Sequence, residues 1–167
     1  AVKLTEAMMA LVRSSDKSIK DSVFQKLNSV EPKSVSTEIL ENLLRVYEVA
    51  IARYGQPAVA ESSLLAERLN NLYPSNNNML DRALSKILVS IDDPNVVTKT
   101  LPLIYEAKDD ATQTNSFMSS SDLILRNPQY GLDIANMLAN IPPSQQIYLA
   151  TMLSSAKNGW SPESQDQ

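Results

Sequence analysis

The sequence predicts an all-α protein, more specifically an α-solenoid of roughly five antiparallel helix pairs. Glycine is scarce, with three in 167 residues, whereas average usage is about 7%. Apolar residues recur three and four positions apart, as in helices that bury one side. Helix pairs are expected to begin near Lys3, Thr37, Asn78, Ala111 and Pro143, at spacings of 34, 41, 33 and 32 residues. This period is typical of stacked helix pairs, and an irregular helical bundle with chance spacing is the alternative.

The first pair is marked by two apolar stripes with a polar break between them. The first stripe is Leu4, Ala7, Met8, Leu11 and Val12. The second stripe is Ile19, Val23, Phe24 and Leu27. Ser14-Ser15-Asp16 separates them and Pro32 follows the second, so the sequence predicts a helical hairpin.

The second pair contains the longest expected helix. Ser36 or Thr37 is placed to cap its start, and Glu38 follows at the positive end of the helix dipole. Gly55 is expected to end this helix, and Pro57 suits the first turn of the next.

The third pair follows a polar cluster at residues 75–78. Its first helix carries an apolar stripe from Leu80 to Ile91, and Asp92-Asp93-Pro94 restarts the chain as a second helix. Pro102 lies inside that second helix, where proline removes a backbone hydrogen bond, so we expect a kink or a later helix start.

The last third has weaker signals. A Ser- and Thr-rich stretch opens at Asp109, and a short helix is expected from Asp133 to Asn140. Pro142-Pro143 precedes a final helix, which Asn158-Gly159 is expected to end. We therefore expect one domain over residues 1–160 and a polar tail over 161–167, the whole being a piece of a larger protein.

Composition excludes most catalytic chemistries. The chain has no cysteine and no histidine, which removes thiol nucleophiles, disulfides, nitrogen or sulfur ligation of zinc and the usual general base. The acid pairs Glu38/Glu41, Glu61/Glu67, Asp92/Asp93 and Asp109/Asp110 fit helix starts and charged helix faces better than a catalytic pair. We expect no enzymatic activity, no cofactor and no metal site.

Charge and hydropathy limit the partners. A net charge of -4 disfavours nucleic acid. Arg45, Arg53 and Arg68 could form a basic strip, but each has a carboxylate within seven residues, as on a solvated helix face. No apolar run approaches the roughly 20 residues that cross a bilayer. A protein partner is therefore expected, without direct membrane insertion.

Four aromatic residues are candidates for an interaction site. Tyr47, Tyr54 and Tyr130 could line a concave groove that binds carbohydrate or peptide. Trp160 either anchors an interface or covers the last hydrophobic layer.

Several segments, in order along nearly the whole chain, resemble the HEAT-repeat module of large bacterial proteins typical of planctomycetes and bacteroidetes. They are Leu44-Arg45-Val46-Tyr47-Glu48, Arg53-Tyr54-Gly55-Gln56-Pro57, Leu72-Tyr73-Pro74, Leu80-Asp81-Arg82-Ala83-Leu84, Ile87-Leu88-Val89, Asp93-Pro94-Asn95-Val96-Val97, Lys99-Thr100 and Gly159-Trp160-Ser161-Pro162-Glu163. The starts Asp16-x-x-Ile19 and Asp93-x-x-Val96 likewise resemble the second helix of HEAT-type repeats.

The resemblance implies a role as well as a fold. In that family the module lies between a dehydrogenase-like propeller and a c-type haem domain, so it implies a scaffold or docking role in a periplasmic or cell-envelope protein. Asp81 stands where the family favours Asn, Ala83 stands where it favours Glu, and the aromatic-rich segment that follows Gly-Trp in the family is missing. No Cys-x-x-Cys-His occurs, so any haem would belong to another part of the protein.

Overall fold

The computed structural model describes residues 2–108, 129 and 142–165, and all of their regular secondary structure is helical. The α-helices are α1 (Val2–Ser14), α2 (Lys20–Asn28), α3 (Thr37–Tyr54), α4 (Val59–Asn70), α5 (Asn78–Ser90), α6 (Val96–Glu106), α10 (Ser144–Leu153) and α11 (Pro162–Gln165). Two short 3-10 helices precede α2 and α3, η1 (Lys17–Ile19) and η2 (Pro32–Ser34). The prediction of an all-α protein is confirmed.

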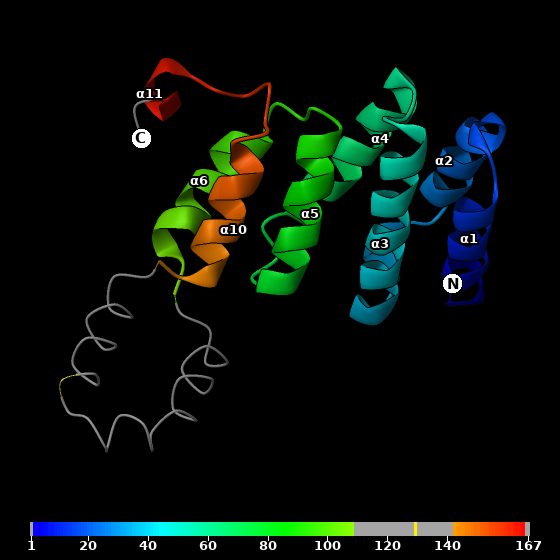
Figure 1. Cartoon of the computed structure of the whole chain (residues 1–167), viewed down its shortest axis with the longest axis horizontal. Helices are drawn as coiled ribbons and strands as arrows, with labels where there is room; N and C mark the ends of the chain where they lie inside the picture. Colours follow the sequence, from blue (N-terminus) through cyan, green and yellow to red (C-terminus); the bar gives the residue numbers. More distant parts are fainter. Residues whose placement is uncertain (1, 109–128, 130–141, 166–167) are drawn as a thin grey trace.

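The helices form two rows (Figure 1). Helices α1, α3, α5 and α10 stand side by side as the front row, and each packs against the next. Helices α2, α4 and α6 form the rear row, with α2 packed on α3 and α4, and α6 packed on α5 and α10. Each of the first three pairs thus contributes one helix to each row.

Polar side chains cap the helix starts that the sequence marks. Asp16 accepts a hydrogen bond from the Ser18 amide at 2.8 Å and begins η1. Ser36, rather than Thr37, caps α3 and accepts from the amide of Ile39 at 3.4 Å. Asn77 caps α5 through two amides of its first turn. These caps satisfy N–H groups that have no partner within the helix, and so fix where each helix begins.

Successive helices of a row bury equivalent positions. In α1 these are Thr5, Met8 and Val12; in α3 they are Leu40, Leu43 and Tyr47; in α5 they are Asp81, Leu84 and Leu88. In the rear row the equivalents are Val23 and Leu27, Leu65 and Leu69, and Val96 and Thr100. The same side of each helix therefore faces the space between the rows.

Polar contacts join the C-terminal end of α2 to α4, and we call them the first joint. The Asn28 side-chain amide donates to the carboxylate of Glu61 in the first turn of α4. Arg68, also on α4, donates to the backbone oxygens of Asn28 and Val30. Carbonyls at a helix C-terminus lack partners within the helix and carry partial negative charge, so a guanidinium there stabilises the end of α2.

A second joint connects α4 to α6 in the same way. Asn70 at the end of α4 donates from Nδ2 to Oδ1 of Asp93, 3.0 Å away. Lys99 on α6 donates to the backbone oxygens of Asn70 at 2.6 Å and Tyr73 at 3.0 Å. The two junctions between the first three pairs therefore use the same contacts: an asparagine bound by an acid, and helix-end carbonyls bound by a cation.

The structure corrects the expected start of α4 and decides between two alternatives for the start of α6. Pro57 does not lie in the first turn of α4, whose N-cap is Ala58; it is buried in the preceding loop. Of the kink or later helix start expected at Pro102, the later start does not occur, since α6 begins at Val96 and contains the proline. In the loop before α6, Asp93 accepts from the Asn95 amide at 3.1 Å, and Pro102 falls on an exposed position of the helix.

The final helix also differs from expectation. It ends at Leu153 instead of Asn158. The amides of Ser155 and Ala156 donate to the carbonyls of Met152 and Leu153, three residues back, and so close the helix with tight turns. Its place differs too, since α10 packs directly on α5 and α6. A regular row of five pairs would put the pair expected near Ala111 between α10 and the pair formed by α5 and α6. That pair, and the short helix expected from Asp133 to Asn140, lie outside the described residues.

The loop after α4 is fixed to α6 through a buried tyrosine. Tyr73 is 2% exposed, and its hydroxyl lies 2.7 Å from Oγ1 of Thr100. Burial raises the pKa of Tyr73 to about 12, from an ordinary value of 10.0. Burial also raises the pKa of Tyr47 in α3.

We expect the chain to lose stability at alkaline pH because of this shift. An unfolded tyrosine ionises near pH 10.0, whereas folded Tyr73 keeps its proton until about pH 12. The contribution is complete below the lower value and is lost as pH rises towards the upper one. Chemical unfolding at a series of pH values, with tyrosinate absorbance as a second signal, measures this. The free energy of unfolding of Tyr73→Phe should fall less steeply with rising pH than that of the unaltered chain. The same slope in both proteins would contradict the assignment to Tyr73.

Candidate functional site

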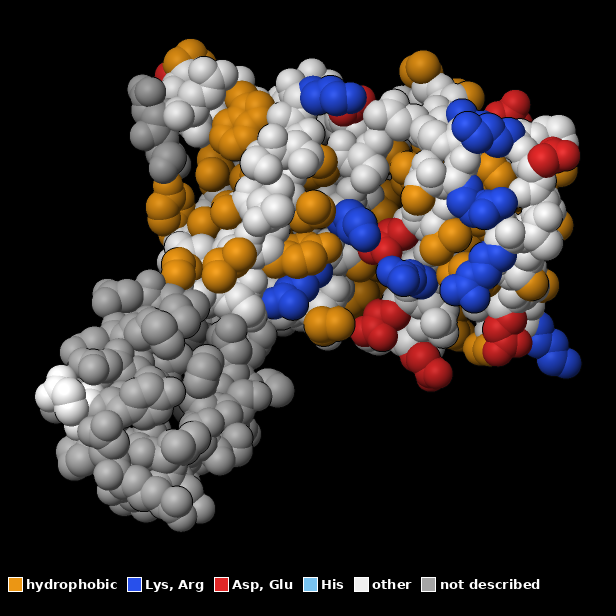
Figure 2. Space-filling view, viewed as in Figure 1, with side chains coloured by type: hydrophobic (Ala, Val, Ile, Leu, Met, Phe, Trp, Pro, Cys, Tyr) orange, Lys and Arg blue, Asp and Glu red, His pale blue; other side chains and the backbone are white. Residues whose placement is uncertain are grey.

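The exposed side of the front row carries different chemistry along its length (Figure 2). Charged side chains of both signs lie over the α1, α3 and α5 part, whereas hydrophobic side chains predominate towards α10. At the α3–α5 boundary, Glu48 accepts from Arg45 at 2.9 Å and pairs with Lys86 at 3.4 Å. The Glu48 side chain is only 12% exposed. This carboxylate therefore ties α5 to α3 and partly neutralises the two cations.

Arg82 ties α5 to α10 at the next boundary. Its Nε donates to Oε1 of Gln145 at 2.6 Å, and its Nη2 donates to Oγ of Ser144 at 3.1 Å. The guanidinium carbon lies 5.2 Å from the centroid of the Tyr148 ring, within the range of a cation–π contact. The first turn of α10 is thus held against α5 by one side chain.

Beside Arg82 lies an apolar hollow of about 310 Å³, which we call the α5–α10 groove. It is lined by Arg82, Ser144, Ile147, Tyr148, Thr151 and Met152. Ile147 is 47% exposed, although it is a large apolar residue. A hollow of aliphatic, aromatic and thioether groups next to a guanidinium suits an apolar side chain of a protein partner.

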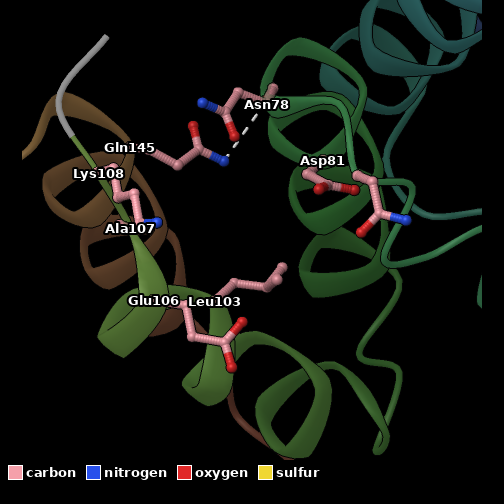
Figure 3. Close-up of a pocket in the computed structure, with 8 residues that line it drawn as sticks. Asn78, Asp81, Leu103, Glu106, Ala107, Lys108 and Gln145 are labelled. Atoms are coloured by element: carbon pink, nitrogen blue, oxygen red, sulfur yellow. Dashed lines mark hydrogen bonds between the residues drawn. The ribbon is translucent and has the colours of Figure 1, made fainter.

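A second hollow, of about 520 Å³, lies between α5, α6 and α10 (Figure 3). Its polar lining consists of Asn76, Asn78, Asp81, Glu106, Lys108 and Gln145. Asp81 already accepts from the amide and hydroxyl of Ser75, at 2.7 and 2.8 Å. Gln145 donates to the backbone oxygen of Asn78 at 3.5 Å. These contacts account for Asp81 and Gln145 as structural residues of the loop before α5 and of α10.

Two tyrosines expected to line a concave groove are core residues instead. Tyr47 is 1% exposed, and its hydroxyl donates to Oδ1 of Asn28 at 2.7 Å. Tyr54 is 5% exposed and donates to the backbone oxygen of Val12 at 3.1 Å. Their position on α3 places the rings between the rows, where a surface ligand does not reach them. Tyr130 lies outside the described residues.

Trp160 is half-buried and packs against the hydrophobic core beyond α10. Its Nε1 donates to the backbone oxygen of Ala156 at 2.9 Å. The preceding Gly159 touches the loop before α6: a Cβ built on it would lie 2.3 Å from the Pro94 oxygen. The indole thus covers the last hydrophobic layer, which is one of its two expected roles.

The acid pairs that lie in the described residues serve mainly in helix starts and joints. Glu61 holds the side chain of Asn28 rather than facing solvent on a charged side of α4, and Asp93 holds Asn70. Asp92 accepts from Nε2 of Gln56 at 2.7 Å. Glu38 and Glu41 are exposed on α3. None of these pairs forms a cleft with a free acid facing a second one.

The three arginines considered as a basic strip have separate tasks. Arg45 pairs with Glu48, Arg53 donates to the Ser15 oxygen at 3.3 Å, and Arg68 belongs to the first joint. Sequence reasoning did not find the joints. The signal was present as Leu-Asn-x-apolar-x-Pro, which occurs at residues 27–32 and again at 69–74.

Metal and membrane chemistry find no support in the part of the chain that the structure describes. Residues 2–108, 129 and 142–165 contain no group of three or more acidic, histidine or cysteine side chains placed to hold a metal ion. Within the same residues, no helix has the length and apolar character needed to cross a bilayer.

Comparison of the chain with models of protein families, with curated proteins and with solved structures finds no match.

Proposed function

We propose that this chain is a non-catalytic, protein-binding scaffold made of stacked helix pairs of the HEAT type. The repeated joint supports this proposal most strongly, because α2–α4 and α4–α6 are joined by asparagines and cations at equivalent positions, each asparagine also bound by an acid near the start of the next rear-row helix. Arrays of this kind hold extended faces rigid and use them to bind other proteins. In the proposed array, three pairs stack in order and α10 provides the next front-row helix.

The α5–α10 groove is the proposed contact for the partner. It combines an exposed isoleucine, an aromatic ring and a guanidinium on a surface that interhelical hydrogen bonds hold in place. Interface hot spots are enriched in aromatic residues and arginine, which cluster in pockets of this type. The resemblance to modules of cell-envelope proteins adds a periplasmic location, beside haem and dehydrogenase domains, as part of the same proposal.

Site-specific crosslinking tests the partner and the groove together. A photoreactive amino acid at Thr151 in the groove should give a discrete crosslinked protein in cells that make this chain. The matched control is the same amino acid at Ser63, an exposed position on α4 in the rear row. Tyr148→Ala should reduce the Thr151 product at least about tenfold, as loss of a hot-spot ring does. Equal products from both positions, or none from Thr151, would contradict the proposal.

Cell fractionation tests the location separately. A periplasmic protein should appear in the fraction released by osmotic shock, and recovery only with cytoplasmic markers would reject that part of the proposal.

A further inference from the structure

The outer end of the two rows, at α1 and α2, carries the residues that form joints elsewhere in the chain. In the rear row, Lys26 of α2 occupies the position that Arg68 has in α4 and Lys99 has in α6. Each cation directly precedes a buried residue, Leu27, Leu69 or Thr100. Arg68 and Lys99 both bind the carbonyls that end the preceding rear-row helix. Lys26 is exposed, and among the described residues its ammonium has no ion pair.

In the front row, α1 likewise exposes a side chain that the later helices of the row bury. Leu11 of α1 is equivalent to Val46 of α3 and Ile87 of α5. Val46 and Ile87 are each 1% exposed, and Val46 borders a hollow that it shares with Met9 and Arg13 of α1. Leu11 is 42% exposed. A leucine therefore stands in the open at the position where later front-row helices bury an aliphatic side chain.

We propose that this end of the rows is an open joint that binds a further helix pair of the same kind. The second helix of that pair would present its C-terminal carbonyls to Lys26, and its first helix would cover Leu11. This inference rests on the stacked-pair arrangement of the proposed function, and it is independent of the α5–α10 groove.

The equivalences favour a helix pair over other occupants. At the rear-row position equivalent to Lys26, the later cations bind the end of a preceding helix. At the front-row position equivalent to Leu11, the later aliphatic residues are buried. The occupant therefore has to supply both a rear-row and a front-row helix. In a second copy of this chain the ends of α2 and α4 are already held by Arg68 and Lys99, so it would have to present the end of α6. Sedimentation distinguishes that occupant from a separate helix pair.

A chain with residues 1–35 repeated once ahead of the full sequence tests the open joint. The repeat keeps the register, because α1 begins at Val2 and α3 begins at the equivalent Thr37. The added helix pair should fold on α1 and α2, keep the helicity per residue unchanged, and raise the thermal midpoint by at least about 4 °C in a single transition. Circular dichroism over a temperature ramp measures both quantities.

Two variants placed in the original copy identify the contact. Lys26→Met should remove about half of the increase in midpoint, and Leu11→Asp should remove nearly all of it. In the chain without the repeat, both substitutions should shift the midpoint by less than about 2 °C, since they alter exposed side chains. A midpoint unaffected by the repeat, with added residues that contribute no helix, would overturn the proposal.

Sedimentation of the unextended chain supplies the second decisive result. A dimer that dissociates on Leu11→Asp would assign this end to a second copy and overturn the helix-pair proposal. Failure of the open joint leaves the crosslinking result at Thr151 unaffected, so the two proposals fail separately.

Discussion

Replacing Gly159 with alanine is expected to lower the free energy of unfolding by about 3 kcal/mol, or to release the segment after α10 from the rear row. Gly159 has a φ of +89°, and a Cβ at this position would lie 2.3 Å from the Pro94 oxygen and 3.0 Å from its carbonyl carbon. Both atoms are backbone, so relief requires the loop before α6 or the whole segment to move. Urea unfolding measures the change in stability.

Gly55→Ala is the matched control for this substitution. Gly55 has a similar φ of +84°, but no atom lies within 4 Å of a Cβ built there. The control therefore carries only backbone strain, about 2 kcal/mol, because φ +84° with ψ −177° is a conformation that essentially only glycine adopts. Hydrogen exchange should show faster exchange after Leu153 in Gly159→Ala only. Equal losses of stability in the two variants would show that close packing on Pro94 is not the cause.

Asn28→Ala is expected to destabilise the chain by about 2 to 4 kcal/mol. The Asn28 side chain accepts from the Tyr47 hydroxyl at 2.7 Å and donates to Glu61, so its loss leaves two groups without partners. Tyr47 is 1% exposed, which makes its unpaired hydroxyl costly. Equilibrium unfolding in urea measures the loss.

The equivalent substitution in the second joint provides the comparison. Asn70 donates to Asp93, but its Oδ1 is buried without a hydrogen-bond donor among the described residues. Asn70→Ala removes one hydrogen bond together with one unsatisfied atom, so we expect a loss of about 1 kcal/mol. A larger loss from Asn70→Ala than from Asn28→Ala would contradict this account of the first joint.

Local signals in the sequence predicted most helix starts correctly. Ser36 and Asp16 act as caps, and Gly55 ends α3 with a positive φ, because these residues act on backbone groups within a few positions. The expected helix starts near Lys3, Thr37, Asn78 and Pro143 lie within one residue of those observed. At Pro57 the expectation was wrong: the proline is buried in the loop ahead of α4 instead of lying in its first turn.

The candidate site was less accessible to sequence reasoning. Tyr47 and Tyr54 were candidates for the lining of a concave binding groove, yet both hydroxyls bond to groups on other helices inside the molecule. The groove depends on Arg82 reaching Gln145, which is 63 positions away in the sequence. No local pattern specifies such a pair, because the contact exists only once α10 has packed on α5.

The sequence alone determined the helical class, the caps and the apolar side of each helix, since these depend on spacing within a few turns of one chain segment. The tertiary structure decided which helices are neighbours. It placed α10 directly on α5 and α6, put two tyrosines in the core, and joined the rear row through Arg68 and Lys99. These features depend on contacts between distant segments, whose free energy is gained only when whole helices have packed together.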